Sequence, residues 1–139
     1  MQVRSLPPSD SSLLVRTYFA DAAAWHATRS AATSENEHGF RAYVEVVDDP
    51  AWDEATPDQI RAAALTGEHA AVLFIVDRAA TEGDFPILVV DLSPEDRSPF
   101  RCIAREIWGV DNNLNLANMD WEEFAANADS DGVHRGFGD

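Results

Sequence analysis

Short apolar runs recur along the chain at a spacing typical of an α/β protein. The runs at 70–76 and 87–92 are almost continuously apolar, which is typical of strands that are buried on both faces of a sheet. The segment 40–47 alternates loosely between apolar and polar positions, which also indicates a strand. The predicted strands are 13–19, 40–47, 70–76, 87–92 and 100–103, with a further short strand at 114–117.

Helix start signals lie between these strands. Thr56, Pro57 and Gln59 form the strongest one, because they combine an N-cap residue, a proline at the first helical position and a capping-box partner. Asp120 and Glu123 have the same capping-box spacing. The predicted helices are 22–33 after the cap Asp21, a helix from Pro57, a short helix near 105–108 and a last helix from Asp120.

The lengths of the connections predict the architecture. The segment 77–86 is too short for a helical crossover, so the strands on either side of it should form an antiparallel hairpin. The element order predicts one compact α/β domain with a mixed, mostly β-α-β sheet of about five or six strands and flanking helices. We assign 1–12 to a flexible leader, 13–128 to the domain and 129–139 to a polar C-terminal tail on the surface.

Charge narrows the classes of partner. The chain has 25 acidic residues and 10 basic residues, no lysine, and a formal net charge of -15. We therefore expect no direct binding to nucleic acid or to an anionic membrane, because phosphate would be repelled. A basic protein partner, a cation or a solubilised surface remain as interpretations. Cys102 is the single cysteine, and no apolar run is long enough to span a bilayer, which together predict a cytoplasmic protein.

Four segments resemble a family of small actinobacterial proteins. They are 13–17 (LLVRT), 88–92 (LVVDL), 112–120 (NNLNLANMD) and 131–137 (DGVHRGF). The family is a domain of unknown function, so the resemblance implies a bacterial cytosolic source and transfers no activity and no catalytic residue. Similar sequences have Phe where this chain has Trp121 and His134, which makes His134 a poor candidate for a shared catalytic role.

Acidic residues follow several predicted strands. Asp48, Asp49, Asp77 and Asp91 occupy such positions. In parallel sheets, ligands bind beyond the carboxyl ends of the strands, and converging carboxylates could hold Mg²⁺. The hairpin would send Asp77 and Asp91 to opposite edges, however. The alternative interpretation is that these acids, like Asp21, cap helices, form turns and face solvent.

Other polar side chains have two interpretations each. Asn112, Asn113 and Asn115 either read a ligand or a partner, or satisfy turns and a strand edge before the last helix. Arginines at three positions either bind an anion together or pair with carboxylates. These are Arg16, Arg41 and Arg101. Cys102 should be a buried, inert thiol, and the four histidines lack metal-ligand spacing.

The leading hypothesis is a non-enzymatic, protein-binding module of the inhibitor or immunity type for a basic partner. Trp52 or Trp121, if exposed, would be anchors rimmed by charge; the alternative interpretation is that both tryptophans belong to the core. The predicted partner-binding residues are Trp52, Asp53, Glu54, Asn112, Asn113, Asn115, Trp121 and Glu122. One alternative is an acidic mimic of nucleic acid that binds a DNA-binding protein, and another is a divalent-metal-dependent hydrolase. No nucleotide-binding or hydrolase motif occurs, so no cofactor and no catalytic residue are predicted.

Overall fold

A computed structural model describes residues 6–7, 9–67 and 69–137. These residues form six strands, four α-helices and three short 3-10 helices. The strands are β1 (Ser12–Arg16), β2 (Val44–Val47), β3 (Val72–Val76), β4 (Pro86–Asp91), β5 (Phe100–Ile103) and β6 (Val133–His134). The helices are α1 (Ala22–Thr33), α2 (Pro57–Ala64), α3 (Ile107–Asn115) and α4 (Trp121–Ala126), with η1 (Pro50–Trp52), η2 (Ala79–Thr81) and η3 (Ala104–Glu106).

The strands form one mixed sheet, which confirms the predicted α/β fold. Their order is β2-β1-β3-β4-β5-β6. β1 is parallel to both β2 and β3, and β5 is parallel to β6, whereas β4 is antiparallel to both of its neighbours. The predicted hairpin is therefore confirmed as β3-β4. Because β4 is antiparallel to β3, the last residue of β4 lies beside the first residue of β3, at the edge where β1 also begins.

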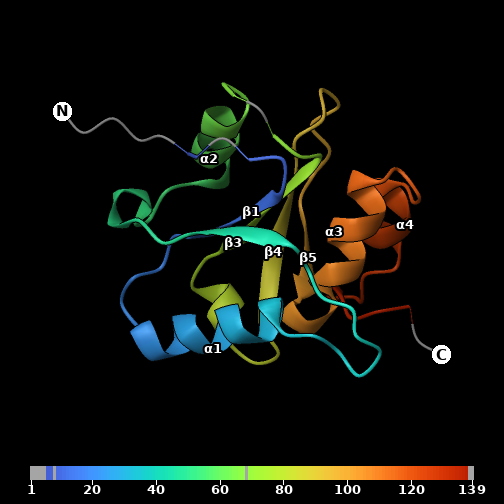
Figure 1. Cartoon of the computed structure of the whole chain (residues 1–139), viewed down its shortest axis with the longest axis horizontal. Coiled ribbons are helices and arrows are strands. Elements are labelled where there is room, and N and C mark those ends of the chain that lie inside the picture. The colour runs from blue at the N-terminus through green and yellow to red at the C-terminus, as the bar shows by residue number, and fades with distance from the viewer. Residues whose placement is uncertain (1–5, 8, 68, 138–139) are drawn as a thin grey trace.

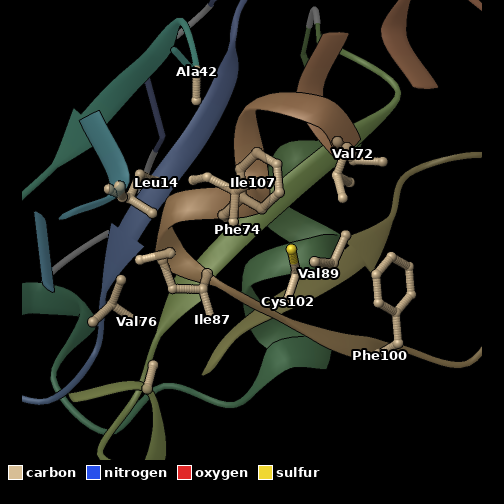
Figure 2. Packing of buried hydrophobic residues seen from close by; sticks show 14 of the residues in the cluster. Leu14, Ala42, Val72, Phe74, Val76, Ile87, Val89, Phe100, Cys102 and Ile107 are labelled. Carbon is tan, nitrogen blue, oxygen red and sulfur yellow. The ribbon is translucent and has the colours of Figure 1, made fainter. Parts of the chain in front are cut away.

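Helices cover both faces of the sheet (Figure 1). One face packs against α1, α3 and α4 around Leu14, Trp25, Phe74, Ile107 and Phe124, and we name this cluster the α1-side core. Figure 2 shows part of this cluster, with the sulfur of Cys102 turned into it. The other face packs against η1 and α2, and the α2-side core contains Val15, Trp52, Ile60, Leu73 and Ile75. Strands in the middle of the sheet are thus apolar on both faces, as their sequence pattern indicates.

Local hydrogen bonds start the helices where the sequence places them. Asp21 caps α1 by accepting a hydrogen bond from the backbone N–H of Ala24. At α2 the Thr56 hydroxyl accepts from the N–H of Gln59, and the Gln59 side chain accepts from the N–H of Thr56. Asp120 and Glu123 form the corresponding capping box of α4. These caps satisfy N–H groups that have no partner inside the helix.

The predicted strand at 114–117 is wrong, because these residues form the last two positions of α3 and the turn that ends it. The backbone N–H of Asn118 donates to the carbonyl of Asn113, and that of Ala117 donates to the carbonyl of Leu114. Ala117 has a φ of 56°. This pattern is a Schellman motif with alanine at the left-handed position where glycine is usual, so the usual signal for a helix end is missing from the sequence.

The C-terminal segment joins the sheet instead of lying wholly on the surface. Val133 and His134 are buried and form β6 against β5. Arg135 then holds the segment by ion pairs to three carboxylates, those of Asp84, Asp129 and Asp131. Near the other terminus, Leu6 packs against the α2-side core. No helix in the described part of the chain has the length and apolar character needed to cross a membrane.

Candidate functional site

Arg16 occupies the carboxyl edge of the parallel strands, where an α/β protein usually binds its ligand. Its Nη1 atom lies 3.1 Å from Oδ1 of Asp48, and its Nε donates to the carbonyl of Tyr18 at 3.2 Å. Its guanidinium lies over the rings of Phe19 and Trp25, 4.2 and 5.4 Å from their centroids. Arg16 is buried, so these contacts replace its lost hydration. Arg16 therefore has all of these partners within the protein. Its position does not require the predicted anion site shared with Arg41 and Arg101.

Each carboxylate proposed as a metal ligand has other partners or faces solvent. Asp77 forms a two-pronged ion pair with Arg101, at 3.0 and 2.7 Å, and also accepts from the N–H of Ala80. Asp49 caps η1 by accepting from the N–H of Ala51. Asp48 pairs with Arg16, as described above. No group of three His, Cys, Asp or Glu residues in the described chain is placed to hold a metal ion. The described carboxylates therefore do not converge on one point, as the hypothesis of a metal-dependent hydrolase requires.

Asp91 lies at the opposite edge of the sheet because β4 runs antiparallel to β3. It is buried, and it accepts hydrogen bonds from the N–H and the hydroxyl of Ser93 and from the N–H of Arg97, each at 2.9 Å. These bonds hold the tight turn between β4 and β5. The interpretation of this acid as a turn residue therefore accounts for its contacts.

The two predicted tryptophan anchors are buried. Trp52 is 1% exposed in the α2-side core, and Trp121 is 5% exposed beside Phe100 in the α1-side core. Their large apolar rings contribute to folding and cannot reach a partner from these positions. Glu122 is exposed but binds Arg97 at 2.8 Å. The hypothesis of tryptophan-centred binding surfaces is therefore wrong, although the neighbouring acids remain accessible.

The asparagine-rich block belongs to α3, and two of its side chains make hydrogen bonds within the fold. The side-chain oxygen of Asn115 accepts from the N–H of Ala71 just before β3, and its amide donates to Ser12 and to Asp111 at 2.9 and 2.8 Å. Asn113 donates to the carbonyl of Gly109 one turn earlier. Asn112 is half-buried on the same helix. The block thus supplies, through Asn115, hydrogen bonds to polar groups at the starts of β1 and β3, as one of the two interpretations supposed. It does so from a helix and not from a turn before the last helix.

Asp111 was missed by sequence reasoning. Its carboxylate is buried and accepts from the backbone N–H of Tyr43 at 3.1 Å, in addition to the amide of Asn115. Burial raises the pKa of Asp111, and hydrogen bonds from Ser12, Tyr43 and Asn115 oppose that rise. The spacing of four residues between Asp111 and Asn115 would have identified the pair, had the segment been assigned to a helix. The network fastens α3 to the start of β1 and to the segment that leads into β2.

Cys102 and His134 are register partners in β5 and β6. Both side chains are buried. Burial raises the pKa of the Cys102 thiol, and the charge of Glu106 raises it further. Burial lowers the pKa of His134, which Asp129 opposes, and its Nδ1 has no hydrogen-bond partner among the residues that the structure describes. A neutral thiol that cannot reach solvent is a poor nucleophile, so this pair is part of the core.

An acidic segment runs from β2 through η1 into α2, and we name residues 42–60 the acidic edge. It contains six carboxylates and no basic residue. All six are exposed: Glu45, Asp48, Asp49, Asp53, Glu54 and Asp58. Among the ion pairs of the described residues, only Asp48 takes part, with Arg16. The other ion pairs of the described residues lie elsewhere, and their arginines are Arg61, Arg78, Arg97, Arg101 and Arg135. Uncompensated negative charge is therefore concentrated along this edge.

Exposed aromatic side chains stand at the start of the acidic edge. Tyr43 is 60% exposed, and the Arg41 guanidinium lies over its ring at 5.0 Å. Phe40 is 50% exposed and stacks on Trp108 of α3, with ring centroids 4.9 Å apart. The segment holding both is fixed by the bond between the N–H of Tyr43 and buried Asp111. Large aromatic groups are thus presented on an anchored backbone.

Two hollows lie near the opposite edge of the sheet. One has a volume of about 200 Å³ and is mainly apolar, between the segment before β1 and the end of α2, with Leu13, Ala64 and Leu92 in its wall. The other has a volume of about 210 Å³ and is lined in part by Asp91, Arg97 and Met119. Asp91 is already used in the turn described above, and Arg97 pairs with Asp91, Glu95 and Glu122, so both charged groups are compensated within the protein.

The sheet order, the helices on both faces and the exposed acidic edge define a small single-domain α/β protein. The chain belongs to the family described as a domain of unknown function, DUF6924, which matches residues 11–137. The resemblance to a family of unknown function is thereby confirmed over nearly the whole chain. No curated protein and no solved structure matches the chain.

Proposed function

We propose that this domain is a non-enzymatic module that binds a basic protein through its acidic edge. The observation that carries the proposal is the run of six exposed carboxylates without a basic residue in 42–60, in a molecule whose ion pairs lie mostly elsewhere. Like charges held side by side repel one another and give no stability to the free fold. A basic partner would relieve that repulsion and would be steered toward this edge.

Backbone conformation at Glu54 supports the same location. Glu54 has a φ of 60°, in the left-handed region that glycine or asparagine adopts at lower cost. Its N–H donates to the carbonyl of Thr17 at 2.8 Å, which holds the loop against the end of β1. A strained position that keeps an exposed carboxylate is consistent with a role for that charge outside folding.

The exposed aromatics replace the buried tryptophans as anchors in this proposal. Tyr43 begins the acidic edge, and Phe40 lies three residues before it. Tyrosine is frequent among the residues that dominate binding energy, because it buries a large area with few rotatable bonds. Tyr43 and Phe40 would supply the apolar contact, and the acids beyond them would supply orientation and rate of association.

The test begins with a pull-down from the source lysate at low and moderate salt, followed by binding kinetics with the purified partner. The test variant neutralises three acids of the acidic edge: Asp53→Asn, Glu54→Gln and Asp58→Asn. We expect its association rate to fall about tenfold at low salt, and the difference to shrink as salt screens the charges.

A matched variant controls for the overall change in net charge. It neutralises three exposed acids outside the acidic edge and outside the segment of Phe40: Glu82→Gln, Asp84→Asn and Glu95→Gln. Its association rate should stay within about twofold of the unmodified protein, because these charges lie outside the proposed contact. Equal losses in the two variants would show a non-specific charge effect, and a pull-down without any basic protein would contradict the proposal.

A further inference from the structure

We propose that the basic partner binds as an extended segment that adds a strand to the free edge of β2. This inference rests on the proposed function and specifies how its acidic edge is used. An extended peptide can join an exposed strand by backbone hydrogen bonds, while alternate side chains decide which peptide is accepted.

The outer side of β2 is open. β2 ends the sheet and pairs with β1 on its other side, in the register that joins Val44 to Ser12 and Val47 to Val15. Apart from that ladder, no hydrogen bond found among the described residues uses the backbone of 44–47. In Figure 1, β2 is the teal arrow in front of the sheet, and no other element covers it in that view. Alternate residues of such a strand point their N–H and C=O groups outward.

The side chains of β2 define what an added strand would carry. Val44 and Val46 pack against the α1-side core and are half-buried, whereas Glu45 is exposed on the opposite face. A neighbouring strand would place its own side chains beside these, in the same alternation. An apolar residue suits the face of Val44 and Val46, and lysine or arginine suits the face of Glu45. The fitting segment therefore alternates apolar and basic residues.

Negative charge at the end of β2 also favours a basic segment over a second copy of this chain. Asp48 and Asp49 follow the strand directly and are exposed, and Tyr43 stands exposed at its start. A second copy of this chain would bring its own Glu45 and its own two aspartates to the same edge. Like charges along a strand edge are a common means by which proteins prevent pairing between copies. The acids thus repel a second copy and accept a basic strand.

The other end of the sheet offers no comparable edge. β6 has two residues, and both are buried. The residue that follows, Arg135, is held by Asp84, Asp129 and Asp131. An added strand would find a short ladder there and a cation already compensated, so β2 is the edge that a basic segment fits.

The experiment measures amide hydrogen exchange of the whole isotope-labelled protein by NMR, with and without a probe peptide. The probe is a capped peptide of alternating valine and lysine. We expect two alternate amides of β2, either those of Val44 and Val46 or those of Glu45 and Val47, to exchange at least about tenfold more slowly with the probe bound. The control peptide has proline in place of each valine. It keeps the charge but lacks half of the N–H donors, and it should leave those amides unprotected.

A charge reversal tests the side-chain part of the proposal. Glu45→Arg should weaken the lysine peptide about tenfold and should allow a peptide of alternating valine and glutamate to bind. Glu82→Arg makes the same change on an exposed residue of the connection between β3 and β4, two strands away from β2 in the sheet, and should alter the affinity for the lysine peptide less than about twofold.

The outcomes separate this inference from the proposed function. Binding of the lysine peptide without protection of alternate β2 amides would overturn strand addition and leave a basic-partner module in place. A captured basic protein that binds equally well to the Glu45→Arg variant would also overturn it. Protection that appears on concentrating the protein alone would show that a second copy is the occupant. Failure of every basic probe and of lysate capture would remove both proposals.

Discussion

Replacing Ala117 by glycine tests how α3 ends and why its end is hidden in the sequence. Ala117 is exposed and has a φ of 56°, between two hydrogen bonds of a Schellman motif. An L-residue in this region costs about 1–2 kcal/mol, which glycine avoids. Glycine also adds freedom to the unfolded chain, which costs about 0.4–1 kcal/mol. The difference predicts that Ala117→Gly raises the free energy of unfolding by about 0.5–1 kcal/mol, or the melting temperature by about 2–5 °C.

The matched control is the same substitution at Ala62, an exposed residue inside α2. There glycine replaces alanine in an ordinary helical conformation and should lower the free energy of unfolding by about 0.8–1 kcal/mol. Urea denaturation with a common m-value measures both variants. A loss of stability at Ala117 equal to that at Ala62 would refute the left-handed turn, because the two positions would then be conformationally alike.

Three further predictions concern buried or paired groups. Burial lowers the pKa of His134, so the contribution of the neutral ring to the unfolding free energy should be complete at pH values above the pKa of an unfolded histidine, near 6.5. As the pH falls below 6.5, the unfolding free energy should decrease by at most about 1.4 kcal/mol per pH unit. His134→Phe should flatten this slope in urea titrations, and an unchanged slope would contradict the burial. Asp77→Ala leaves the half-buried guanidinium of Arg101 without its carboxylate and should cost about 1–3 kcal/mol in the same assay, whereas a loss below about 0.5 kcal/mol would show that the pair is dispensable. The Cys102 thiol should stay unreactive toward a disulfide reagent in the native protein and react fully on denaturation, and rapid native labelling would contradict its position in the core.

Helix starts could be predicted from the sequence because each depends on residues within one turn. The caps at Asp21, Thr56 and Asp120 involve bonds between residues at most three positions apart. Helix ends were less visible. The Schellman turn at Ala117 uses bonds that almost any side chain permits, and the sequence there lacks the glycine that usually marks it.

Tryptophan burial shows where local pattern fails. Trp52 is flanked by acids and alanines in the sequence, which is compatible with either an exposed anchor or a core residue. The structure buries it because η1 folds back over Val15 and Ile75, residues far away in the chain. Tyr43 and Phe40 carried no signal that distinguished them from core aromatics, and they are the exposed ones.

The sequence by itself determined the class of fold, the order of most elements, the hairpin between β3 and β4, and the excess of negative charge. Those properties follow from periodicity, short-range hydrogen bonds and composition, which act within a few residues or over the whole chain. The tertiary structure decided where the charge remains uncompensated and which strand edge stays open. It joined Arg16 to Asp48 and Arg101 to Asp77, and left the acids of 42–60 mostly unpaired. Such pairings depend on contacts between distant segments, and they form only when the sheet has brought those segments together.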